Sequence, residues 1–183
     1  MTAETIINKA REFLGVTGSP KGSHNVLFNT AYYGYEVNDK SAYYWCVVFV
    51  WYVFRAAGAS VLFCNGDKVN RCKTVKSWAE AYGLVVDKVN VRPGDLVLYD
   101  WEPNGTPDHI GIATSASDNN GTFTAIEGNV DDAVKELSRN LSKVVMAVRP
   151  AYVQEAEPVN CEQCPILEAL RTLYNKMKQE VNQ

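Results

Sequence analysis

The chain has 183 residues, of which 46% are hydrophobic and 21% are charged, and its formal net charge is −3. This length and apolar content suit one compact domain with a short appendage, and they leave too little chain for two full domains. The slightly negative net charge leaves no basic surface for nucleic acid, so we expect no nucleic-acid partner.

The N-terminus lacks the basic and then apolar layout of a signal peptide, and no uncharged apolar run is long enough to span a bilayer. We therefore expect a protein made in the cytoplasm without a signal peptide and without membrane insertion. The five cysteines are an odd number, so at least one thiol stays unpaired within a monomer. This favours a reduced compartment or a reactive cysteine over a closed disulfide framework.

The first half of the chain reads as helical. Residues 3–14 carry apolar side chains on one helical face, and residues 15–42 are rich in Gly, Ser, Asn and Tyr, which predicts a long irregular segment. Residues 46–57 form the longest apolar run. Its length and the glycine at position 58 predict a buried helix, although its valines favour a strand.

The second half changes to strand-like patterns after a predicted helix at residues 74–82. Short apolar runs alternate there with turns that contain Gly, Pro, Asn and Asp. The predicted strands are residues 84–86, 96–99, 110–113, 122–126 and 144–148. Helices followed by a meander of short strands indicate an α+β domain, with N-terminal helices packed on a mostly antiparallel sheet.

Three segments are expected along the chain: a domain at residues 1–150, a linker at 151–164 and a C-terminal amphipathic helix at 165–183. The linker is poor in apolar residues, and Pro165 suits the first position of a helix that carries an apolar stripe. This helix could pack on its own domain, form a homo-oligomer or dock on a partner subunit, and the sequence leaves these alternatives open.

Cys46 stands at the head of the long apolar run. If the run is a helix, the thiol lies in its first turn, where unpaired N–H groups and the helix dipole favour the thiolate. The alternative is a cysteine that serves as a small buried hydrophobe, and this stretch taken alone favours that alternative.

A thiolate nucleophile needs a base, and histidine is the usual base at neutral pH. His109 begins an apolar strand that would hold its ring in place, whereas His24 lies in a polar loop and is predicted to be solvated. On the next strand, Glu127 and Asn129 would point to the same side, so either could accept the second N–H of His109. A histidine without a role and a simple turn at positions 128 and 129 are the alternatives.

A cysteine at a helix start, followed by a histidine and a polar acceptor on strands, follows the logic of papain-like cysteine hydrolases. Four motifs, in order along residues 1–150, resemble the CHAP domain (cysteine, histidine-dependent amidohydrolase/peptidase). They are Tyr44-Trp45-Cys46, Arg92-Pro93-Gly94-Asp95-Leu96-Val97, Gly105-Thr106-Pro107-Asp108-His109-Ile110-Gly111-Ile112 and Ile126-Glu127-Gly128-Asn129. The stretch Asn29-Thr30-Ala31-Tyr32-Tyr33-Gly34 resembles the approach loop of the phage and prophage endolysin branch from Gram-positive hosts.

The resemblance implies a papain-like α+β fold and hydrolysis of an amide bond in peptidoglycan. Cys46 would be the nucleophile, His109 the base, and Glu127 and Asn129 the residues at the family's orienting positions. The bond would be the N-acetylmuramoyl-L-alanine amide or a stem or cross-bridge peptide bond, and a phage or prophage lysin of this kind would act at the cell wall after release. The alternatives are a non-catalytic wall-binding or virion structural module, and a cysteine protease acting on proteins.

No cofactor and no metal are expected. Some CHAP domains bind calcium, but the acidic and amide residues before the cysteine are too sparse for such a loop. They are Glu36, Asn38 and Asp39. Four cysteines could form a zinc site, because Cys161 and Cys164 have the spacing of zinc ligands and Cys64 and Cys72 could complete the set. The two pairs lie in different segments, however, so we expect unpaired thiols.

Papain-type enzymes place a glutamine before the cysteine as a donor to the oxyanion. Residues 40–45 contain no glutamine, so the second oxyanion donor is unassigned from the sequence.

Overall fold

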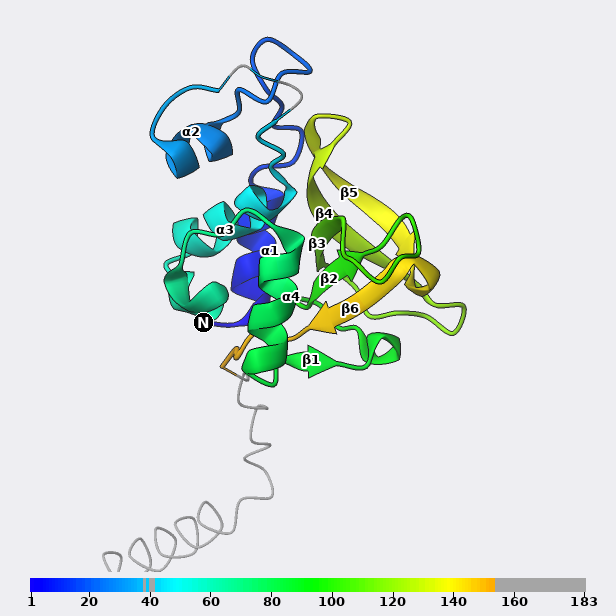
Figure 1. Ribbon diagram of the computed structural model, residues 1–183. Coiled ribbons are helices and arrows are strands. Elements are labelled where there is room, and N and C mark those ends of the chain that lie inside the picture. Colours follow the sequence, from blue (N-terminus) through cyan, green and yellow to red (C-terminus); the bar gives the residue numbers. More distant parts are fainter. Residues whose placement is uncertain (38, 40–41, 154–183) are drawn as a thin grey trace, which may run out of the picture. The chain divides into compact units, whose positions relative to one another are not determined.

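The computed structural model describes residues 1–37, 39 and 42–153, and Met1–Val153 forms one compact unit (Figure 1). The predicted C-terminal helix at 165–183 lies outside the described residues, as do Cys161 and Cys164. Of the predicted linker, residues 151–153 are described, and the Tyr152 hydroxyl donates a hydrogen bond to the Gly94 carbonyl at 2.8 Å. The chain therefore still packs on the domain at the start of that segment.

Four α-helices lie in the described part of the chain. They are α1 (Ala3–Arg11), α2 (Leu27–Tyr33), α3 (Cys46–Ala56) and α4 (Cys72–Ala81). Short 3₁₀ turns are η1 (Ser60–Leu62), η2 (Cys64–Gly66), η3 (Lys88–Asn90) and η4 (Leu141–Lys143). No helix in the described ranges has the length and apolar character to cross a membrane.

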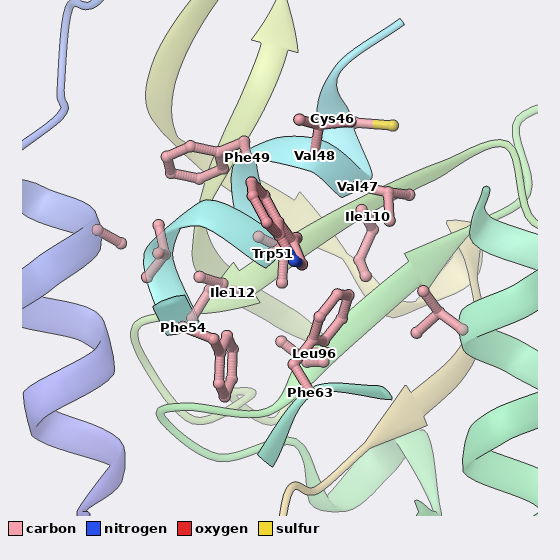
Figure 2. Packing of buried hydrophobic residues seen from close by; sticks show 14 of the residues in the cluster. Cys46, Val47, Val48, Phe49, Trp51, Phe54, Phe63, Leu96, Ile110 and Ile112 are labelled. Carbon is pink, nitrogen blue, oxygen red and sulfur yellow. The ribbon is translucent and has the colours of Figure 1, made fainter. Parts of the chain in front are cut away.

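Helix α3 follows the sequence prediction for residues 46–57. The valines prefer strands, but this preference is weak. Burial of apolar side chains on nearly every side of the helix stabilises it by more than the preference costs. Figure 2 shows Phe49, Trp51 and Phe54 of α3 packed in one cluster with residues of neighbouring elements, including Ile110 and Ile112.

Helix α2 lies in the segment that was predicted to be irregular, so that prediction is wrong for residues 27–33. Its sequence contains Asn, Thr and three aromatic residues, which are weak helix formers, and its N-terminus has no side-chain cap. The helix is held instead by Phe28, which is fully buried against the rings of Trp45 and Phe49. Tertiary contacts therefore stabilise helix α2, because its own residues have low helix propensity.

Within the described residues, the sheet has six strands in the order β1-β6-β2-β3-β4-β5, and each of their pairings is antiparallel. The strands are β1 (Val85–Val86), β2 (Leu96–Tyr99), β3 (His109–Ala113), β4 (Thr122–Val130), β5 (Ala133–Asn140) and β6 (Val144–Val148). Helices α1 and α3 contact β3 and β4, and α1, α3 and α4 gather on one side of the sheet (Figure 1). The predicted α+β class, with helices packed on an antiparallel sheet, is confirmed.

The strand β5 was not predicted, and β4 continues past residue 126. Asp131 and Asp132 both take positive φ angles, 48° and 58°, and Val130 pairs with Ala133 across them. Two consecutive residues of this kind make the turn whose twist matches a tight hairpin. The turn therefore lies after Val130 and not at Gly128-Asn129.

Gly128 allows the sheet to approach helix α3 closely. A Cβ atom at this position would lie 2.5 Å from the Cβ of Phe49, which is shorter than any tolerable contact. Because α3 begins three residues before Phe49, this approach brings β4 and the start of α3 together.

Candidate active site

The thiol of Cys46 lies at the first residue of α3 and is 8% exposed. The Val47 backbone N–H donates a hydrogen bond to the Cys46 sulfur, as the free N–H groups of a first helical turn can do. Figure 2 shows this sulfur pointing away from the labelled apolar side chains of the core. The geometry gives the thiol a polar environment that an ordinary buried cysteine lacks.

The backbone before Cys46 is held from two sides. Tyr43 takes a left-handed φ of 60°, and its carbonyl accepts a hydrogen bond of 2.9 Å from the Asn29 amide. Nδ1 of His24 lies 2.5 Å from the Ala42 carbonyl oxygen, and its Nε2 lies 3.3 Å from Asp132 Oδ1. His24 is 3% exposed. The prediction of a solvated loop histidine is therefore wrong, because the ring ties the approach segment to the β4–β5 turn.

His109 is the first residue of β3, and the strand register explains how it meets Glu127. Gly111 pairs with Glu127, so His109 lies diagonally across from Glu127 on the same face of the sheet. A Cβ at Gly111 would lie 2.6 Å from Glu127 Cγ, so the glycine leaves the space that the carboxylate needs. Nε2 of His109 lies 2.9 Å from Glu127 Oε2. The His109 ring also hydrogen-bonds the Cys46 thiol.

Glu127 is fully buried, and its carboxylate has a second partner that the sequence did not reveal. Arg139 on β5 donates from Nε to Oε1 at 2.8 Å and from Nη2 to Oε2 at 2.7 Å. Arg139 was missed because β5 itself was not predicted. Residues 133–140 read Ala-Val-Lys-Glu-Leu-Ser-Arg-Asn and have no regular alternation of apolar and polar residues, so the sequence carried no clear strand signal there.

Asn129 has a different place from the other three predicted site residues. It takes a φ of 62° inside the irregularity between Glu127 and Val130, so the alternation expected of a regular strand does not hold there. Among the residues that the structure describes, the carboxylate of Glu127 is the hydrogen-bond partner of His109 Nε2. The structure thus brings Cys46, His109 and Glu127 together and leaves Asn129 beside them.

Cys72, the first residue of α4, is the other group beside Cys46 that sequence reasoning did not assign to the site. It is 7% exposed, and its thiol hydrogen-bonds the Cys46 thiol. The hydrogen bond to Cys46, burial, and the charges of Cys46 and Asp108 all raise the pKa of the Cys72 thiol. Of the two sulfurs, Cys46 is therefore the one that carries the negative charge, and Cys72 is the donor.

The three groups have shifted acidities that fit an ion pair. The pKa of Cys46 is well below that of an ordinary thiol, because hydrogen bonds from Cys72 and the charge and hydrogen bond of His109 outweigh burial. Burial lowers the pKa of His109, but the bonds to Cys46 and Glu127 outweigh it and raise the pKa to about 9. Burial raises the pKa of Glu127, but Arg139 and His109 outweigh it and lower the pKa. These directions favour a thiolate, an imidazolium and a carboxylate at neutral pH.

A family model of the CHAP domain matches residues 38–129, a stretch that contains Cys46, His109, Glu127 and Asn129. The chain belongs to the CHAP domain family. The resemblance seen in the sequence is confirmed, and the family is one of cysteine- and histidine-dependent amidohydrolases and peptidases.

The chain was also compared with solved structures and with curated proteins. The crystal structure of Ly7917 is similar to this chain with a TM-score of 0.47 and 17% sequence identity, covering 82% of this chain and 63% of that one. This chain therefore spans less than two thirds of the length of that protein. A search of curated proteins found no match.

No group of three or more His, Cys, Asp or Glu side chains that could hold a metal ion occurs within residues 1–37, 39 and 42–153. Cys64 and Cys72 are both free thiols, and they lie in different surroundings. Burial and the charge of Asp67 raise the pKa of Cys64 to about 12, whereas the Cys72 thiol is hydrogen-bonded to the Cys46 thiol.

Replacing Cys72 with alanine is expected to raise the pKa of the Cys46 thiol, because the variant loses the S–H donor that stabilises the thiolate. Cys72→Ser keeps a donor in the same place and should stay close to the parent. The measurement is the rate of iodoacetamide alkylation of the Cys46 peptide against pH, followed by mass spectrometry. The same midpoint in Cys72→Ala and the parent would show that the Cys72 thiol has no influence on Cys46.

Proposed function

We propose that this CHAP domain cleaves one amide bond of peptidoglycan by cysteine nucleophilic catalysis, with Cys46 as nucleophile, His109 as base and Glu127 as the orienting acceptor. The bond is the N-acetylmuramoyl-L-alanine amide or a stem or cross-bridge peptide bond. The observation that carries the proposal is the unbroken line of contacts from the Cys46 thiol through the His109 ring to the buried Glu127 carboxylate.

The contacts support a two-step reaction. The Cys46 thiolate attacks the carbonyl carbon, and the backbone N–H groups of the first turn of α3, which has no side-chain cap, are the donors we assign to the oxyanion. His109 bonds Glu127 through Nε2, so Nδ1 is the nitrogen that gives a proton to the leaving amine. A thioester on Cys46 remains. Neutral His109 then takes a proton from water, which attacks the thioester, and the carboxylic acid product leaves as the thiolate and imidazolium form again.

The biological setting that we propose is a phage or prophage lysin, made in the cytoplasm and acting at the cell wall after release. Its support is the resemblance of residues 29–34 to the approach loop of that branch. Self-association or docking through residues 165–183 stays a prediction, since that segment lies outside the described residues.

Digestion of purified Gram-positive cell wall by the full chain tests the proposal and names the bond. Soluble fragments are identified by mass spectrometry, and newly freed amino groups are labelled. Free L-alanine amino groups together with intact stem peptides indicate the amidase, and other new amino groups indicate the endopeptidase.

The matched control is Cys46→Ala, which should release no fragments. Equal release by parent and variant would overturn the assignment of the nucleophile. An inactive parent on wall would favour the non-catalytic module. Cleavage of casein by the parent at rates above those on wall would favour a protease acting on proteins.

A further inference from the structure

Arg139 reaches Glu127 from the strand on the far side of β4. Its guanidinium makes two parallel bonds to the carboxylate, at 2.8 and 2.7 Å, and Oε2 of Glu127 is shared with His109. The same guanidinium lies over the rings of Trp101 and Tyr99, at 5.1 and 5.7 Å from their centroids. The Arg139 guanidinium is therefore held by two sets of contacts, one with the Glu127 carboxylate and one with the two aromatic rings.

The charges of the buried cluster explain why a cation is needed there. The working state has a negative charge on Cys46, a positive charge on His109 and a negative charge on Glu127, so these three groups alone carry one excess negative charge. A fully buried carboxylate without compensation takes up a proton, because burial disfavours its charged form. Arg139 supplies the missing positive charge and brings the cluster to neutrality.

We propose that Arg139 is a positioning residue for the hydrolysis proposed above: it balances the charge of Glu127 and holds the carboxylate in the one orientation that aligns His109 with Cys46. The inference rests on the proposed function. Arg139 acts on the reacting atoms through its bonds to Glu127, which in turn bonds His109.

The form of the contact favours arginine over lysine. A guanidinium is planar, matches both carboxylate oxygens at once and stacks on aromatic rings, whereas an ammonium offers a point charge. Arg139 uses both properties, through its two bonds to Glu127 and its place over Tyr99 and Trp101. A lysine at this position would keep the charge and lose the alignment.

The groups around Glu127 determine the direction of the pH effect. They are His109 from β3, Arg139 and Lys135 from β5, Tyr99 from β2 and, beyond His109, Cys46 and Cys72 from α3 and α4. Without Arg139 the pKa of Glu127 rises, so the carboxylate is neutral up to a higher pH. The acid limb of the activity profile therefore moves toward neutral pH, and the alkaline limb, which His109 determines, does not move down.

Three variants of the full chain test the inference, with kcat and KM on solubilised peptidoglycan measured against pH. Arg139→Gln should lose about 10- to 100-fold in kcat at mildly acidic pH, with KM unchanged and partial recovery at alkaline pH, which is the loss expected when general acid–base catalysis is impaired. Arg139→Lys should keep the acid limb of the parent and lose kcat evenly at all pH values.

Lys135→Gln is the matched control. Lys135 lies on the same strand and faces Glu127 in the register, but its ammonium pairs with exposed Asp131 at 2.6 Å. This variant loses the same charge and should keep the profile of the parent. Circular dichroism and thermal unfolding report whether each variant is folded. If Arg139→Gln is unfolded, Arg139→Lys becomes the variant that tests the inference.

Each outcome separates the two proposals. An inactive parent contradicts the proposed function. An active parent together with the same pH profile in Arg139→Gln and Lys135→Gln overturns the role of Arg139. If Arg139→Gln does not fold, an acid limb in Arg139→Lys that moves up would overturn the charge-balancing role.

Discussion

Replacing Cys46 with alanine is expected to lower the kcat for peptidoglycan hydrolysis by about 10⁶-fold, the scale seen when the nucleophile of a catalytic triad is removed. His109 and Glu127 remain in place in the variant, but no atom can form the thioester. The fold should persist, because alanine keeps the helix start and removes only one sulfur atom from the edge of the core. The measurements are the release of labelled amino groups and thermal unfolding.

Cys64→Ala is the control for loss of a buried thiol. Cys64 is also buried, and burial together with Asp67 raises its pKa to about 12, so it is a protonated thiol at neutral pH. This variant should hydrolyse wall at the rate of the parent. More than a hundredth of parental activity in Cys46→Ala would contradict the role of Cys46 as nucleophile.

Replacing Glu127 with glutamine is expected to lower kcat by about 10⁴-fold, as when the acidic member of a triad becomes an amide. The amide keeps the shape of the side chain but removes the charge that stabilises the His109 imidazolium. In the parent, activity is expected to fall as pH rises through the His109 pKa of about 9, because the imidazolium is lost. Glu127 raises that pKa, so the alkaline limb of kcat/KM in the variant should lie at lower pH.

Glu136→Gln provides the comparison for this change. Glu136 lies on β5, and its carboxylate accepts a hydrogen bond of 2.7 Å from the Thr114 hydroxyl, away from His109. Its profile should match that of the parent. An alkaline limb that stays in place in Glu127→Gln would mean that Glu127 does not stabilise the imidazolium.

Much of the fold could be predicted from local pattern. The apolar run at 46–57 is longer than an ordinary strand, and Gly58 follows it as a helix terminator. These two features indicated helix α3 in spite of its valines. Four of the six strands matched apolar runs of four or five residues between turn residues, and the two-residue strand β1 lay within a fifth. Patterns of this kind depend on the period of each element, which a sequence displays directly.

The elements that were missed are those whose own residues show no clear periodic pattern. Helix α2 is stabilised by the burial of Phe28, and β5 is an edge strand with many charged residues that forms because a tight turn returns it to β4. His24 is buried because the turn at Asp132 covers it. The partners of Phe28 and His24 are distant in the chain, and β5, although it follows β4 directly, has no regular alternation of apolar and polar residues, so no local pattern indicates these features.

The sequence by itself determined the α+β class, the helix that carries Cys46 and the order of cysteine, histidine and acidic acceptor, because each follows from periodicity and residue type. Only the tertiary structure decided which acceptor bonds His109, and that Cys72 and Arg139 join the site. Those choices depend on the strand register, on the space left by Gly111 and on the charge balance of a buried cluster. All three arise only when segments distant in the chain meet.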